Sequence, residues 1–173
     1  MRSIFLGLLF VFPAISQAED LAEGWSTLGS IKVSLSDEEL NMPILVEPGG
    51  QQYAFQMDAG GPKIISIEGH VLSDAGTPAW PSLSIDVLMM GPMTIVQEVT
   101  FYKSGGSTPE MWIMQDGAGE ATLSESKLSD DNVFTGKVQA TLVPWSRAEQ
   151  TVISGEVEVT ITAEIESRIP EKN

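Results

Sequence analysis

The sequence predicts an all-β protein: an antiparallel β-sandwich, or a flattened barrel, of about nine or ten strands. Three observations predict this fold class. Apolar residues alternate with polar ones along most of the chain, turn residues separate the alternating runs, and no stretch has the 3.6-residue period of a helix. Alternation places the apolar side chains on one face of a sheet, so these runs indicate strands with one buried face.

The first 18 residues have the pattern of a secretory signal peptide. Arg2 supplies a positive start, residues 4–12 are an unbroken apolar run, and residues 16–18 (Ser-Gln-Ala) supply small residues at a cleavage site. The apolar run is about half as long as the ~20 residues that a membrane-spanning helix needs. No cysteine follows it to carry a lipid anchor. We therefore expect residues 1–18 to be removed on export.

The remaining chain has the length of one domain. Of its 173 residues, we expect 19–29 to form a flexible lead-in and 30–173 to form a single β-sandwich domain. The chain contains no cysteine, which excludes disulfides, thiolate metal ligands and a cysteine nucleophile. Small exported domains of animals usually depend on disulfides, so we expect a bacterial protein that is periplasmic or secreted.

The first two predicted strands form a hairpin. In residues 31–35 three apolar side chains alternate with polar ones. A second strand is expected at residues 41–46, at a sheet edge, because Pro43 has no N–H to donate to a neighbouring strand. Residues 36–39 (Ser-Asp-Glu-Glu) are interpreted as an acidic hairpin turn, although the same spacing is that of a capping box at the start of a helical turn.

The later strands follow the same alternation. They are expected at residues 65–71, 83–89, 93–101, 138–142 and 157–165. Glycine, proline, aspartate and asparagine gather between the strands and indicate turns, at residues 47–50, 59–62, 104–106, 116–117 and 129–132.

The charge of the chain excludes a nucleic-acid binder. Its 24 acidic residues outnumber 9 lysines and arginines, for a net charge of −15. Such a surface repels phosphate backbones and anionic lipid headgroups. There is also no basic amphipathic stretch that would lie on a membrane. We expect no stable membrane insertion once the signal peptide has been removed.

Catalytic motifs are absent, so the sequence predicts that the protein is not an enzyme. The one histidine, His70, falls on the polar face of its strand beside Glu68, and we expect it to be exposed there. A histidine and a carboxylate can orient a base, but no nucleophile motif accompanies this pair. A hydrolase built on Glu68 and His70 would require a pocket that brings further polar groups onto the same face.

Two tryptophans are candidate anchors for a ligand. Trp80 and Trp145 adjoin prolines at expected strand ends, where an indole can serve as a platform for a sugar or a protein. We predict Trp80, Trp145 and Arg147 as ligand-binding residues of an exported, non-enzymatic binding module with a protein or glycan partner. The predicted edge strand at residues 41–46 is a second candidate surface, for a partner's strand. Alternatively, each indole closes one end of the core.

Methionines suggest a different function. Met90 and Met93 flank the Gly-Pro turn at residues 91–92, where their side chains would face each other. Thioether sulfurs are soft ligands that select Cu(I), so this pair predicts a periplasmic Cu(I) carrier as the alternative. The competing explanation is that these flexible side chains fill gaps in the core.

Overall fold

The computed structural model describes residues 21–107, 109–115, 117–153 and 158–172, so the expected signal peptide lies outside the described residues. The described part contains eleven strands and no helix. No helix in it is therefore long and apolar enough to cross a membrane. The strands are β1 (Ser26–Leu35), β2 (Glu38–Val46), β3 (Ala54–Asp58), β4 (Lys63–Leu72), β5 (Pro78–Met90), β6 (Met93–Tyr102), β7 (Met111–Met114), β8 (Glu120–Leu128), β9 (Val133–Ser146), β10 (Thr151–Val152) and β11 (Val159–Arg168).

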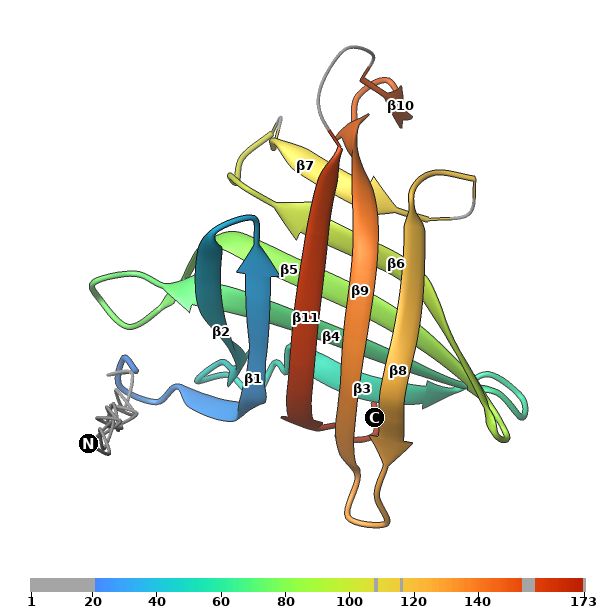
Figure 1. Ribbon diagram of the computed structural model, residues 1–173. Coiled ribbons are helices and arrows are strands. Elements are labelled where there is room, and N and C mark those ends of the chain that lie inside the picture. Colours follow the sequence, from blue (N-terminus) through green and yellow to red (C-terminus); the bar gives the residue numbers. More distant parts are fainter. Residues whose placement is uncertain (1–20, 108, 116, 154–157, 173) are drawn as a thin grey trace, which may run out of the picture.

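All eleven strands belong to one antiparallel sheet in the order β2-β1-β11-β9-β7-β6-β5-β4-β3, with β8 and β10 also paired to β9. The sheet is folded into two layers, with β1, β2, β8, β9 and β11 in front of β3 to β7 (Figure 1). The long strand β9 joins the layers, because it pairs with β11 and β8 over most of its length and with β7 near its end. The sheet is not closed into a barrel, and the predicted sandwich-like all-β class is confirmed.

The core fills the space between the two layers. In most predicted strands, the apolar residues of one parity are the buried ones, as alternation requires. The predicted run 93–101 is an exception, because Met93 and Ile95 are exposed and only Val99 and Phe101 of that face are buried. Side chains with no exposed surface come from both layers: Ile31, Met42, Ile44, Leu45, Ile65, Ile67, Leu83, Ile85, Val87, Val99, Phe134, Val138, Leu142, Ile161 and Ala163.

The observed strands extend beyond the predicted runs. β1 begins at Ser26 and therefore includes residues 26–29, which were expected to belong to the flexible lead-in. Gly29 adopts a positive φ there, and a Cβ at this position would collide with the backbone of Glu166 on β11. Strands β3, β8 and β10 were not predicted, and residue 157 of the last predicted run lies outside the described residues.

The predicted position of β2 at a sheet edge is confirmed, but most of the strand is not exposed to solvent. β2 is the last strand at one end of the sheet, and the turn before it is the predicted hairpin turn, with Ser36 at a φ of 54°. Residues 42–45 are nevertheless buried, because β2 crosses close to Gly69 of β4. The expectation of an exposed edge for a partner's strand is therefore wrong.

Candidate functional site

The outer face of the back layer carries a row of polar and aromatic residues. His70 of β4 lies opposite Ser82 of β5, and Ser82 lies opposite Tyr102 of β6. The next row along the same strands contains Glu68 and Ser84. These residues alternate with core residues, so they face away from the space between the layers.

Trp80 is directed onto this row by an irregularity in β5. Val71 pairs with Ala79 and His70 with Ser82, so Trp80 and its neighbour oppose no residue of β4. A bulge of this kind redirects a side chain. The ring centroid of Trp80 consequently lies 6.1 Å from the ring centroid of His70 and 5.5 Å from the ring centroid of Tyr102. Both contacts have edge-to-face geometry.

Gly105 supports the indole from the loop between β6 and β7. A Cβ at this position would collide with Nε1 and Cε2 of Trp80, so only glycine lets the loop approach so closely. Despite these neighbours, 44% of Trp80 remains exposed. The indole is thus held in place and still accessible to a ligand.

A pocket of about 270 Å³ adjoins the exposed indole. Its walls come from three strands of the back layer, from the β6–β7 loop and from the turn that follows β9. They combine aromatic, hydroxyl, carboxylate and guanidinium groups: Glu68, Trp80, Ser84, Tyr102, Gly105, Gly106, Pro109 and Arg147.

Two polar atoms behind the pocket are buried without a hydrogen-bond partner in the described part of the chain: Nε2 of His70 and Oγ of Ser82. Nε2 lies 3.1 Å from Oε1 of Glu68, but the contact does not have hydrogen-bond geometry. Only 6% of His70 is exposed, because the rings of Tyr53 and Trp80 pack against it. The expectation that His70 is exposed is therefore wrong, although its strand face was predicted correctly.

The tyrosines of this region are held in their neutral form. Burial and a 2.6 Å hydrogen bond that Tyr53 donates to Glu47 raise the pKa of Tyr53 to about 12. Burial also raises the pKa of Tyr102, an effect that the positive charge of Arg147 opposes. The hydroxyl of Tyr102 therefore stays protonated at neutral pH and can both donate and accept a hydrogen bond.

The structure brings together two of the three predicted binding residues. Trp80 and Arg147 line the same pocket, whereas Trp145 is not among the described residues that line it. Trp145 is half-buried near the end of β9, where it pairs with Val152 of β10. Sequence reasoning missed Tyr102, which lies one residue beyond a predicted strand.

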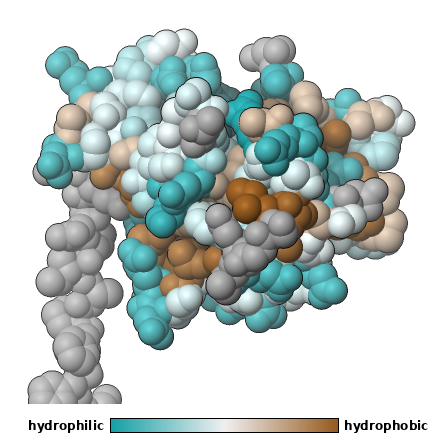
Figure 2. All heavy atoms as spheres, turned by 90° about the horizontal axis from the view of Figure 1, so that it is seen from above, coloured by the Kyte–Doolittle hydropathy of each residue, from teal (hydrophilic) through white to brown (hydrophobic). Residues whose placement is uncertain are grey.

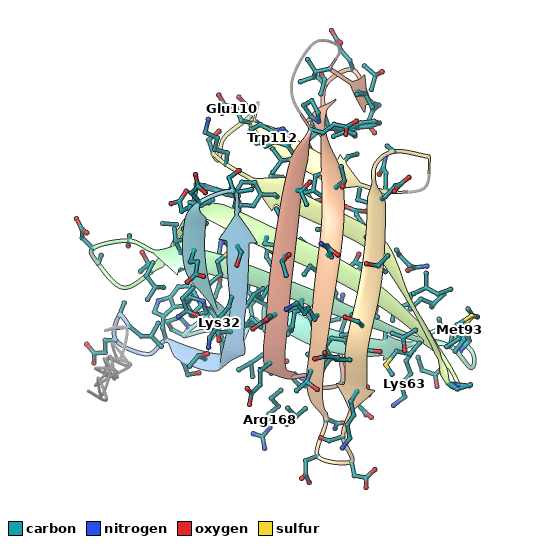
Figure 3. All side chains as sticks on the ribbon, in the orientation of Figure 1. Lys32, Lys63, Met93, Glu110, Trp112 and Arg168 are labelled. Atoms are coloured by element: carbon teal, nitrogen blue, oxygen red, sulfur yellow. The ribbon has the colours of Figure 1, made fainter. Side chains whose placement is uncertain are left out.

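The candidate copper ligands lie at the other end of the same layer. Met90 and Met93 are cross-strand partners, as the sequence predicted, and 50% of Met93 is exposed. Figure 3 shows Met93 at the tip of the β5–β6 hairpin. By contrast, Met42, Met111 and Met114 are buried and fill the core. In the described part of the chain, no three histidine, aspartate or glutamate side chains gather where they could hold a metal ion.

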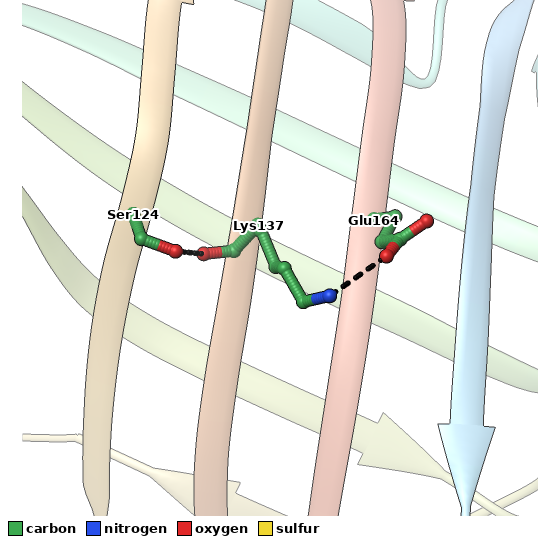
Figure 4. A network of polar contacts seen from close by, with 3 residues as sticks. All are labelled: Ser124, Lys137 and Glu164. Atoms are coloured by element: carbon green, nitrogen blue, oxygen red, sulfur yellow. Dashed lines mark hydrogen bonds and ion pairs between the residues drawn. The ribbon is translucent and has the colours of Figure 1, made fainter.

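A second hollow, of about 340 Å³, lies on the outer face of the front layer, over β1, β9 and β11. Lys137 crosses it to donate a 2.8 Å hydrogen bond to Glu164, and Ser124 donates to the carbonyl of Lys137 (Figure 4). The contact with Lys137 holds the pKa of Glu164 below its usual value. Because these two charges pair with each other at an exposed surface, this hollow is a weaker candidate for a ligand-binding site than the pocket beside Trp80, here called the Trp80 pocket.

The surface seen from above is a mosaic in which small hydrophobic areas are separated by hydrophilic residues (Figure 2). This pattern is ordinary for a folded domain and does not by itself mark a broad docking face. No protein-family model, curated protein or solved structure matches this chain.

Proposed function

We propose that the protein is an exported, non-enzymatic binding module of the bacterial envelope and that the Trp80 pocket is its ligand-binding site. The observation that carries the proposal is the indole of Trp80, 44% exposed although His70, Tyr102 and Gly105 hold it in place. A fixed aromatic side chain contributes contact area at little cost in conformational entropy. Such groups, beside a few polar ones, are typical of binding sites.

Export is supported by the sequence alone. Residues 1–18 have the order of charge, apolar run and small residues that marks a signal peptide. The absence of cysteine favours a bacterial envelope or extracellular location over secretion from an animal cell. The mature protein would then meet its ligand in the periplasm or in the medium.

The size of the pocket favours a small ligand, or one unit of a larger one. Small-molecule sites usually enclose about 300–1,000 Å³, and this pocket of about 270 Å³ is just below that range. One sugar unit or one side chain of a protein partner is therefore the scale of ligand that it suits.

The polar groups favour binding over hydrolysis. The pocket does bring Ser84 and Tyr102 onto the face of Glu68 and His70, as the hydrolase hypothesis required. A nucleophile must, however, be activated by a neighbouring base. Ser82 is the serine opposite His70, and its hydroxyl has no hydrogen-bond partner in the described residues. His70 therefore does not accept a hydrogen bond from this serine, as a base that activates a nucleophile would.

The test is a binding screen of the mature protein against glycans and peptides, followed by calorimetry on Trp80→Ala. We expect at least a tenfold loss of affinity, because truncating a central aromatic anchor typically costs about 2 kcal/mol or more. Ile95→Ala is the matched control, since Ile95 of β6 is similarly exposed on the same layer but does not line the pocket. Equal affinities of Trp80→Ala and the unmodified protein would contradict the proposal.

The second candidate function is transport of Cu(I). It is favoured by the direct pairing of Met90 with the half-exposed Met93, which puts two thioethers on one surface. Competition against a Cu(I) chelator should then show tight binding that is lost in the Met90→Leu, Met93→Leu double variant. Binding that persists in this variant would exclude the pair as the site.

A further inference from the structure

We propose that the Trp80 pocket takes a single neutral sugar ring, stacked on the indole with its hydroxyl groups divided between Glu68 and Arg147. This inference rests on the proposed function, because it names the ligand of the same site. Three features of the pocket support it: the shape of the aromatic wall, the balance of donors and acceptors, and the charges around the pocket.

The aromatic wall suits a ring with one apolar face. A pyranose ring presents C–H groups on its faces and hydroxyls around its rim, so it can lie flat on an indole while its hydroxyls reach sideways. Tyr102 stands edge-to-face against Trp80, at 61° between the ring planes, and closes one side of the platform. The bound ring would therefore contact aromatic surface below and polar groups around its rim.

The polar groups of the pocket are matched to hydroxyls. Arg147 only donates hydrogen bonds and an ionised Glu68 only accepts them, whereas the hydroxyls of Ser84 and Tyr102 do both. A sugar hydroxyl is itself both a donor and an acceptor, so it can pair with any of these groups. A ligand that only donates or only accepts would leave part of this set unpaired on binding.

The charges around the pocket disfavour an ionic ligand of either sign. An ammonium group would be attracted by Glu68 but repelled by Arg147. A carboxylate or phosphate would be attracted by Arg147 but repelled by Glu68 and by a chain whose net charge is −15. Because both charges line one small pocket, a neutral ligand with a polar rim is the class that both can bind.

Two unpaired polar atoms lie behind the wall of the pocket and not in its lining. Nε2 of His70 and Oγ of Ser82 are buried without hydrogen-bond partners in the described residues, and Nε2 lies 3.1 Å from the pocket-lining carboxylate of Glu68. Buried polar atoms are normally paired, with protein or with ordered water. A water molecule held behind the wall would supply a partner there, so these atoms are not counted among the groups that bind the sugar.

The experiment compares sugars that have the same ring but different charge. The mature protein is titrated by calorimetry with neutral monosaccharides and short neutral oligosaccharides. The best ligand is then compared with its amino-sugar and uronic-acid derivatives, and a peptide library serves as the other arm. We expect a neutral sugar to bind and each charged derivative to bind at least tenfold more weakly.

Three variants connect the ligand to the pocket. Glu68→Gln and Arg147→Gln should each weaken binding of the neutral sugar, because each loses a charge-assisted hydrogen bond. Gly105→Ala should weaken it as well, because the added Cβ displaces the indole. The far-ultraviolet circular dichroism and the unfolding midpoint establish that each variant is folded, and Ile95→Ala should bind like the unmodified protein.

The outcomes separate this inference from the proposed function. Tighter binding of a charged derivative, or binding of a peptide but no sugar in a manner that requires Trp80, would overturn the neutral-sugar assignment and leave the pocket as the binding site. Sugar binding that is unchanged in Trp80→Ala would overturn the pocket itself, and with it the proposed function.

Discussion

At the residue scale, the position of Trp80 depends on the absence of a side chain at residue 105. The Cα of Gly105 packs against the indole, and a methyl group there would occupy the space of Nε1. The irregularity in β5 directs the indole, and a glycine from a loop 25 residues further along the chain leaves room for it.

We expect Gly105→Ala to move the indole and to destabilise the protein by about 1–3 kcal/mol, the usual cost of forcing extra volume into a packed contact. The chemical shift of the Trp80 indole N–H reports the movement, and urea unfolding reports the stability. Gly49→Ala is the matched control, because nothing lies within 4 Å of a Cβ at that position. An unmoved indole signal in Gly105→Ala would show that the loop can accommodate a methyl group without displacing Trp80.

Tyr53, which packs against His70 in the same region, makes the stability of the protein depend on pH in the alkaline range. Its pKa is raised to about 12, so the neutral phenol is favoured in the folded state. The resulting stabilisation is fully present below the ordinary tyrosine pKa of about 10 and is lost as the pH rises through about 12.

We expect Tyr53→Phe to reduce the fall in stability between pH 10 and pH 12, because it removes the group that titrates there. At neutral pH the same change should cost about 1 kcal/mol, through loss of the hydrogen bond to Glu47. Urea unfolding at both pH values measures the two effects. A fall of equal size in the variant and the unmodified protein would assign the alkaline transition to other groups, such as Tyr102.

At the scale of elements, the close crossing of β2 over β4 closes one side of the sandwich. A Cβ at Gly69 would lie 2.9 Å from the Cβ of Met42 and 3.0 Å from its carbonyl oxygen. Gly69 therefore permits the two strands to approach, and this approach buries β2 although it is a sheet edge.

We expect Gly69→Ala to separate β2 from β4 and to lower the free energy of unfolding by about 1–3 kcal/mol. Hydrogen exchange should show faster exchange of the β2 amides, since that strand loses its cover. If stability and exchange in Gly69→Ala match those of the unmodified protein, the crossing is looser than the structure indicates.

The strands that sequence reasoning found are those with one well-buried face. Alternation identified β1, β4, β5, β9 and β11, because burial on one side requires it. It also identified β6, although only Val99 and Phe101 of the predicted apolar face are buried there. β8 was missed, since only a few of its residues, such as Leu123, pack against the core. Strand parity also placed His70 on the correct face, but parity does not reveal that Tyr53 and Trp80 cover that face.

At the scale of the whole molecule, the site is assembled from segments that are far apart in the chain. Glu68, Trp80, Tyr102, Gly105 and Arg147 meet because β4, β5 and β6 are neighbours and because β9 carries its final turn to the same layer. The sequence indicated Trp80 and Arg147 from their local setting. Their meeting with Tyr102 depends on strand order, which the alternation pattern does not encode.

The most direct test of the account follows the indole N–H signals of the four tryptophans by NMR during titration with the best neutral sugar. Each signal is assigned by a single Trp→Phe variant. We expect the Trp80 signal to shift and saturate while the signal of Trp145, which lies outside the pocket lining, stays in place. A shift of the Trp145 signal with an unmoved Trp80 signal would contradict the assignment of the site.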